Sequence, residues 1–124
     1  MAKILVIDDD RSVRRLLETF LRRKGYEVVL ADTGQRGLEL FRHECPDIIV
    51  LDLKMPGMDG LTVLQRLRQL DRAQPVIMFT GTWTPKVEQQ VRALGVTELV
   101  NKACSQEHLE AALTRALKNV APVT

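Results

Sequence analysis

Short apolar runs alternate along the chain with stretches in which apolar residues recur every three or four positions. The short runs predict β-strands, because strands buried on both faces of a sheet read as continuous apolar segments. We expect five of them, over residues 4–7, 26–30, 47–51, 75–79 and 97–100. The stretches that follow each run keep their apolar residues on one side, which predicts amphipathic helices packed against the sheet.

Residues that favour helix ends mark the limits of these helices. Gly25 is expected to end the first helix, because glycine adopts the left-handed conformation at a helix C-terminus. Thr33 and Ser105 are the expected N-caps of the second and last helices. The second helix is expected to run to about residue 44, and two more helices over about 59–70 and 85–94.

The order of strand and helix, repeated five times, predicts an α/β fold with a parallel sheet and helices on both faces. The 124 residues suit one domain, so we expect residues 1–124 to form a single unit with a frayed tail over 119–124. In doubly wound sheets, ligands bind beyond the carboxyl ends of the strands. Chemistry is therefore expected at that edge.

Composition narrows the classes of function. Eighteen basic and 16 acidic residues give a formal charge of +2, which does not indicate a strong binder of nucleic acid or membranes. The sequence has no run as long as a membrane span and does not open on a signal-peptide pattern, so we expect a soluble cytoplasmic protein. Cys45 and Cys104 are expected to be free thiols, and His43 and His108 to be surface residues.

Acidic residues follow two of the expected strands. Asp8, Asp9 and Asp10 follow the first strand, and Asp52 follows the third. Both positions fall at the same edge of a parallel sheet, where crowded carboxylates repel unless a cation neutralises them. Mg²⁺ binds through one or two carboxylates and leaves room for a phosphate. The cluster predicts a cation site, with Asp10 expected instead as the first helix cap; Asp8 and Asp9 as ordinary loop acids are the alternative.

A hydroxyl and an amine follow two further strands. Thr80 ends the fourth strand and Lys102 follows the fifth. Taken singly, Thr80 is typical of a turn and Lys102 of a solvated surface. Together with the acids they fit phosphoryl chemistry, in which the Asp52 carboxylate is the nucleophile. Mg²⁺ and Lys102 would offset the charge of the transferred group, and Thr80 would donate to one of its oxygens.

These residues resemble the receiver domain of two-component response regulators, over the whole chain. The acidic pair Asp8-Asp9, the segment LDLKMPGMDG around Asp52, Thr80 after PVIMF, and Lys102 all occur in the family's order. The resemblance is to single-domain regulators of the chemotaxis type. It implies a flavodoxin-like sheet with strand order 2-1-3-4-5.

The same resemblance implies a function in phosphorelay signal transduction. Asp52 would accept a phosphoryl group from the phosphohistidine of a sensor histidine kinase or phosphotransfer protein. Asp9 would bind Mg²⁺ directly, Asp8 largely through water, and Asp52 and the backbone carbonyl of Lys54 would complete the set. The aspartyl phosphate would switch the conformation and control a partner protein or output domain. Such a protein catalyses only its own phosphorylation and slow dephosphorylation, so it is not an enzyme acting on a separate substrate.

Two positions depart from the family pattern. Ala103 follows Lys102 where the family usually has proline, and we expect a trans peptide bond there. Leu99 stands where the family often has the tyrosine or phenylalanine that reports the switch, so a different output mechanism is expected. Trp83 is expected to be a packing or loop residue rather than an output surface.

Two further positions bear on the lifetime of a phosphoryl group. Lys54 and Thr82 lie two residues beyond Asp52 and Thr80, positions that influence water access in this family. We hypothesise that Lys54 slows or alters hydrolysis; an exposed lysine without a kinetic role is the alternative.

The first helix also carries a run of basic residues: Arg11, Arg14, Arg15, Arg22, Arg23 and Lys24. We interpret them mainly as a solvated face, although the family docks its kinase on this helix.

Three rival functions use the same fold. A haloacid dehalogenase-type hydrolase needs an acid two residues after its nucleophile, where this chain has Lys54. A flavin or nucleotide-binding module needs a glycine-rich phosphate loop, which does not follow the first strand here. Without a metal, the acids at 8–10 would repel phosphate. A degenerate receiver that acts only as a protein-interaction module stays open because of Leu99 and Ala103.

Overall fold

The computed structural model describes residues 2–118, so the expected frayed tail over 119–124 lies outside the described residues. The five strands form one parallel sheet in the order β2-β1-β3-β4-β5. Their bounds are β1 (Lys3–Ile7), β2 (Glu27–Ala31), β3 (Ile48–Leu51), β4 (Val76–Thr80) and β5 (Glu98–Asn101). The predicted α/β class and the strand order 2-1-3-4-5 are confirmed.

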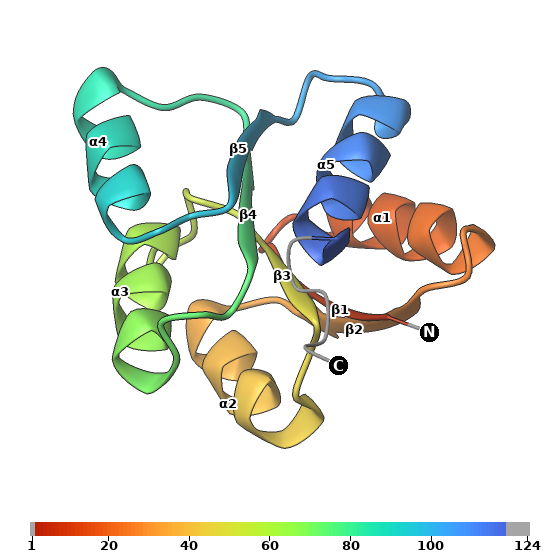
Figure 1. The fold of residues 1–124 in the computed structure, drawn as a ribbon, viewed down its shortest axis with the longest axis horizontal. Helices are drawn as coiled ribbons and strands as arrows, with labels where there is room; N and C mark the ends of the chain where they lie inside the picture. The colour runs from red at the N-terminus through yellow and green to blue at the C-terminus, as the bar shows by residue number, and fades with distance from the viewer. Residues whose placement is uncertain (1, 119–124) are drawn as a thin grey trace.

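Five helices cover the two faces of the sheet. They are α1 (Arg11–Arg23), α2 (Gly34–Glu44), α3 (Gly60–Leu70), α4 (Pro85–Ala93) and α5 (Gln106–Lys118). Helices α1 and α5 lie on one face, and α2, α3 and α4 lie on the other (Figure 1).

The three inner strands β1, β3 and β4 are almost wholly apolar because each contributes side chains to two cores. In β1, Ile4 and Val6 pack on the side of α1 and α5, whereas Leu5 and Ile7 pack on the side of α3 and α4. All four side chains are fully buried. Burial of such an aliphatic side chain contributes roughly 1.5–3 kcal/mol to stability. Two filled cores therefore hold the strands rigidly under the edge where the acids stand.

The expected helix caps are confirmed. The Thr33 hydroxyl accepts a hydrogen bond from the Arg36 amide at 3.0 Å, and the Ser105 hydroxyl accepts one from the His108 amide at 3.2 Å. Gly25 has φ +93°, the left-handed conformation that ends α1. Each cap satisfies a backbone group that the helix leaves free, and so fixes where the adjoining loop begins.

Every predicted strand start is wrong by one residue: β1 begins one residue earlier than expected, and the other four strands begin one residue later. The Tyr26 amide donates to the Leu21 carbonyl at 3.1 Å, so Tyr26 closes α1 instead of opening β2. Asp47 precedes β3, and its carboxylate accepts a hydrogen bond from the Lys3 amide at 2.7 Å.

The carboxyl ends of β2, β4 and β5 each extend one residue further than predicted. In β4 and β5 the added residues, Thr80 and Asn101, pair with each other. The extension places Thr80 inside the sheet, 1% exposed, and not in a turn.

Other expectations concern single residues. The described residues contain no cis peptide bond, so the bond between Lys102 and Ala103 is trans as expected. Cys45 and Cys104 are free thiols, and Cys45 ends α2 in the left-handed conformation. Among residues 2–118, the helices are too short or too polar to cross a membrane.

Candidate functional site

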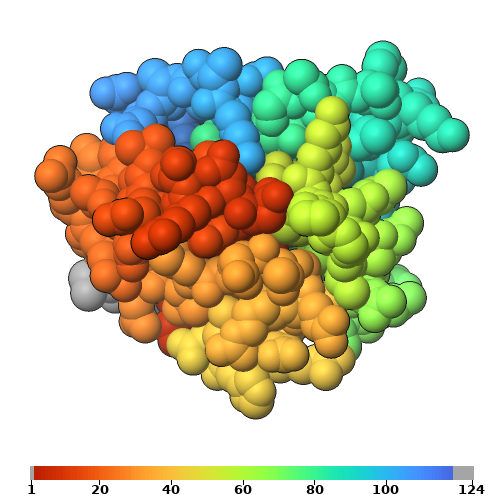
Figure 2. Space-filling view, turned by 180° about the vertical axis from the view of Figure 1, so that it is seen from behind, coloured from red at the N-terminus to blue at the C-terminus, as the bar shows by residue number. Residues whose placement is uncertain are grey.

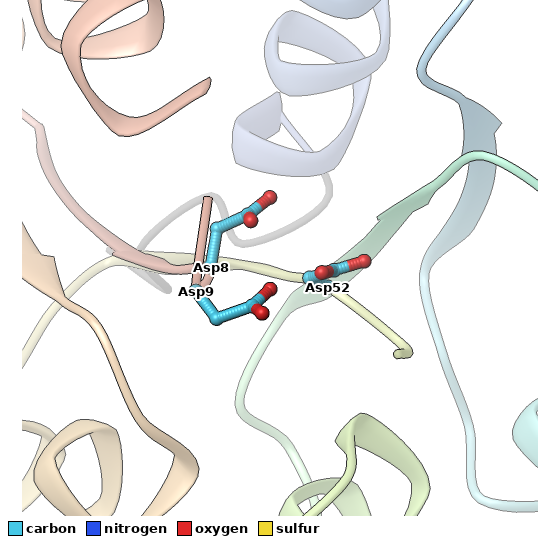
Figure 3. A group of neighbouring side chains, drawn as sticks. All are labelled: Asp8, Asp9 and Asp52. Atoms are coloured by element: carbon cyan, nitrogen blue, oxygen red, sulfur yellow. The ribbon is translucent and has the colours of Figure 1, made fainter. Parts of the chain in front are cut away.

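Three carboxylates meet at the carboxyl edge of the sheet. Asp8 and Asp9 follow β1, and Asp52 follows the adjacent strand β3. One carboxylate oxygen of each lies within 4.8 Å of the others, and Figure 3 shows Asp8 and Asp9 projecting on the side where Asp52 lies. Asp8 is 2% exposed and Asp52 is 4% exposed, whereas Asp9 is open to solvent. The predicted clustering of acids is confirmed.

Asp10, the last acid of the run, has a different role. Its carboxylate accepts hydrogen bonds from the Ser12 amide at 2.8 Å and the Val13 amide at 3.4 Å. It is therefore the N-cap of α1, as expected, and stands outside the cluster.

Lys102 joins the cluster from the loop after β5. Its Nζ lies 2.9 Å from Asp8 Oδ2 and 3.4 Å from Asp52 Oδ2. Burial alone would lower the pKa of Lys102, but the hydrogen bond and charge of Asp8, with the charge of Asp52, outweigh it and raise that pKa. The ammonium is thus held in its charged form between two carboxylates.

Thr80 is fixed beside this ion pair by the backbone. Its carbonyl accepts a hydrogen bond from the Lys102 amide at 2.9 Å, which ties the end of β4 to the lysine loop. Thr80 and Lys102, both expected at one edge of the sheet, are therefore neighbours in the folded chain.

Burial has the largest influence on the pKa of Asp52, the candidate nucleophile. Burial first, and then the charge of the neighbouring Asp8 carboxylate, raise the pKa of Asp52 from 3.8 to about 6. Attraction to Lys102 and the backbone amide of Lys54 act in the opposite direction but do not cancel the increase. One ammonium does not balance the clustered acids, so the site favours an additional cation.

The site fits Mg²⁺ by its chemistry. Mg²⁺ prefers hard oxygen ligands, and three carboxylate oxygens within 4.8 Å of one another supply them. The exposed Asp9 leaves one side open to water, which Mg²⁺ retains in most protein sites.

Two side chains have contacts that sequence reasoning missed. Arg14, interpreted as part of a solvated face, donates to the Asp8 carbonyl at 2.8 Å and so braces the acidic loop. Lys54 Nζ donates to Thr82 Oγ1 at 2.9 Å, which links the loops after β3 and β4. The only signal of this pairing in the sequence was its spacing: Lys54 lies two residues after Asp52, and Thr82 lies two residues after Thr80.

Leu99 and Trp83 both pack into the core on the α3 and α4 side, and both are half-buried. The Trp83 indole also donates to Glu88 Oε1 at 3.3 Å. Trp83 is therefore a packing residue, as expected, with an additional polar anchor on α4.

Comparison with known proteins identifies the family and finds the same fold in solved structures. The response regulator receiver domain family matches residues 4–114. A probable transcriptional regulator, ycf27, of Porphyridium aerugineum is 41% identical over 118 residues, covering 95% of this chain and 49% of its own. The chain thus spans about half the length of the curated relatives it matches.

Two solved structures are similar over nearly their whole length. The chemotaxis protein CheY4 of Vibrio cholerae has a TM-score of 0.89 at 31% identity, with 94% of this chain and 98% of that chain covered. The response regulator TrrA of Thermotoga maritima, solved with Mg²⁺ and BeF, has a TM-score of 0.86 at 29% identity, covering 94% and 99%. The chain belongs to the response regulator receiver domain family.

Proposed function

We propose that this receiver accepts a phosphoryl group on Asp52 in a Mg²⁺-dependent reaction and passes the signal on by changing conformation. One observation supports this above all: the buried Asp52 carboxylate shares its site with Asp8, Asp9 and the Lys102 ammonium. The donor is the phosphohistidine of a sensor histidine kinase or a phosphotransfer protein. TrrA, the structural neighbour solved with Mg²⁺ and BeF, supports the same chemistry here.

In the transfer step, an Asp52 carboxylate oxygen attacks the phosphorus atom and a new oxygen–phosphorus bond forms. The nitrogen–phosphorus bond of the phosphohistidine breaks, and its electron pair stays on the imidazole ring. Lys102 contributes positive charge beside the attacked group, and Thr80 a hydroxyl at the end of β4. Water later hydrolyses the aspartyl phosphate and restores the carboxylate, so the chain acts on no separate substrate.

Mg²⁺ would be held by Asp9 directly, by Asp8 largely through water, by Asp52, and by the backbone carbonyl of Lys54. When bound, it supplies positive charge to the phosphoryl oxygens. The carboxylates would hold the ion, and the end of β3 keeps the Asp52 carboxylate in a fixed position at the edge of the sheet.

The output goes to a partner protein or to an attached output domain. The ycf27 relatives are roughly twice as long as this chain and are named as probable transcriptional regulators, which supports the second route. This domain itself contacts neither nucleic acid nor membrane in our proposal, and it works in the cytoplasm. A degenerate receiver without phosphorylation is the second candidate, favoured by Leu99 and Ala103 at two positions of the usual switch.

Intact-mass measurement separates the two candidates. We expect incubation with acetyl phosphate and Mg²⁺ to add the mass of one phosphoryl group, and incubation with acetyl phosphate and excess chelator to add none. The physical reason is that the acidic cluster repels a phosphoryl donor until a divalent cation offsets it. A folded protein whose mass stays unchanged in both incubations would support the degenerate receiver.

A further inference from the structure

Two loops flank the Asp52 carboxylate, and one side-chain hydrogen bond joins them. Lys54 Nζ on the β3–α3 loop donates to Thr82 Oγ1 on the β4–α4 loop at 2.9 Å. Figure 2 shows the yellow-green β3–α3 segment at the surface between the red segment that follows β1 and the green-to-cyan segment that follows β4. The bond therefore spans the two sides of the site at the surface.

Among residues 2–118, the Lys54–Thr82 bond is one of two hydrogen bonds that join the β4–α4 loop to segments distant in the sequence. The other is the hydrogen bond from Asn101 Nδ2 to the Gly81 carbonyl at 3.2 Å. The Asn101 contact is between uncharged groups. The Lys54 contact is made by a charged ammonium, which belongs to a residue only two positions after Asp52.

A phosphoryl group on Asp52 competes for this ammonium. A charged donor binds an ionised oxygen more strongly than a neutral hydroxyl, because charge adds to the hydrogen bond. Both Lys54 and Thr82 are exposed, so water solvates the freed hydroxyl and breaking their bond leaves no buried group unsatisfied.

The loop is connected to α4 through Trp83. Trp83 is half-buried in the core beside Val87 and Leu99, and its indole Nε1 donates to Glu88 Oε1 at 3.3 Å. Glu88 Oε2 in turn accepts a hydrogen bond from Arg92 Nε at 3.0 Å. A displacement at Thr82 therefore reaches α4 through its neighbour Trp83.

We propose that the Lys54–Thr82 hydrogen bond is a latch: it holds the β4–α4 loop in the unphosphorylated position, and phosphorylation of Asp52 opens it by drawing the Lys54 ammonium away. The released loop shifts Trp83, and Trp83 transmits this displacement to α4. Leu99 has no aromatic ring that could transmit it. This inference rests on the proposed phosphorylation of Asp52. A latch biases two pre-existing loop positions and needs no further ligand.

The chain has one tryptophan, so its fluorescence reports Trp83 alone. We expect Mg²⁺ with beryllofluoride, a phosphoryl mimic, to change the emission of the wild type. Thr82→Val keeps the size of the side chain but removes the acceptor. Its resting emission is expected to lie about half or more of the way toward the wild-type spectrum with beryllofluoride, because opening the latch shifts the population in advance.

Two further variants complete the test. Lys54→Met keeps the length of the side chain without the ammonium, and is expected to shift the resting emission in the same direction. Lys86→Met, at an exposed position in the first turn of α4, is the matched control and is expected to behave as the wild type. Circular dichroism establishes that each variant is folded.

Uptake of the phosphoryl group is measured separately by intact mass with acetyl phosphate. A wild type that takes up no phosphoryl group contradicts the proposed function. A wild type that takes it up, while folded Thr82→Val and Lys54→Met both show the wild-type resting emission and the wild-type response, overturns the latch alone.

Discussion

An Asp52→Ala variant is expected to gain no phosphoryl group from acetyl phosphate and Mg²⁺ under conditions that modify the wild type fully. Asp52 is the acid at the end of β3, is 4% exposed, and shares the site with Asp8, Asp9 and Lys102. Alanine has no nucleophilic oxygen, and no other acid of the cluster stands at that strand end. Intact mass shows the result directly.

The matched control is Asp10→Ser, in the same run of acids. Serine also caps helices, so α1 is preserved, and Asp10 lies outside the carboxylate cluster. We expect this variant to be phosphorylated as the wild type is. Phosphorylation of Asp52→Ala at the wild-type rate would show that another residue is the acceptor.

A Gly60→Ala variant is expected to lose at least about 2 kcal/mol of unfolding free energy, as for an overpacked core site. A Cβ on Gly60 would collide with the Asp52 carbonyl oxygen and lie 2.7 Å from Leu53 Cα, both backbone atoms that cannot rotate away. Helix propensity alone would favour alanine over glycine by about 1 kcal/mol at a helical position. The collision outweighs this gain and displaces the backbone that carries Asp52, so phosphorylation slows as well.

Urea denaturation and the rate of phosphorylation measure both effects. Gly81→Ala is the control, because a Cβ there meets no atom within 4 Å and its φ is not in the left-handed region. We expect Gly81→Ala to have the wild-type stability and rate. Equal stability of Gly60→Ala and the wild type would contradict the close packing of the loop behind Asp52.

Much of the fold follows from local patterns in the sequence. The runs that form β1, β3 and β4 are apolar on both faces, so their positions could be predicted to within one or two residues. Their limits were less accurate, because the pairing of Thr80 with Asn101 and the hydrogen bond from the Tyr26 amide back to Leu21 depend on neighbouring segments. The strand order came from family resemblance, since five similar strands can be arranged in several orders.

The candidate site, like the fold, could be predicted from the sequence only in part. Asp8, Asp9 and Asp52 could be placed together because parallel strands bring their carboxyl ends to one edge. The bond between Lys54 and Thr82 could not be predicted, because 28 residues separate two exposed side chains whose loops meet only in the folded chain. Backbone position thus follows from pattern, whereas contacts of long polar side chains depend on tertiary structure.

The central claim is that Asp8, Asp9 and Asp52 together bind one divalent ion, and titration with Mn²⁺ in place of Mg²⁺ tests it most directly. Electron paramagnetic resonance measures the free Mn²⁺, and we expect one bound ion per chain. Because the pKa of Asp52 is about 6 in the metal-free protein, binding below that pH must displace its proton. The apparent affinity should then fall by about tenfold per pH unit between pH 6 and pH 4 and level off above pH 7.

Asp9→Ala should weaken binding by about tenfold or more, since it removes a direct ligand, and Asp10→Ser should leave binding unchanged. One ion bound with these dependences is the predicted result. Mn²⁺ that binds Asp9→Ala as tightly as the wild type, with no loss of affinity at acidic pH, would contradict the account.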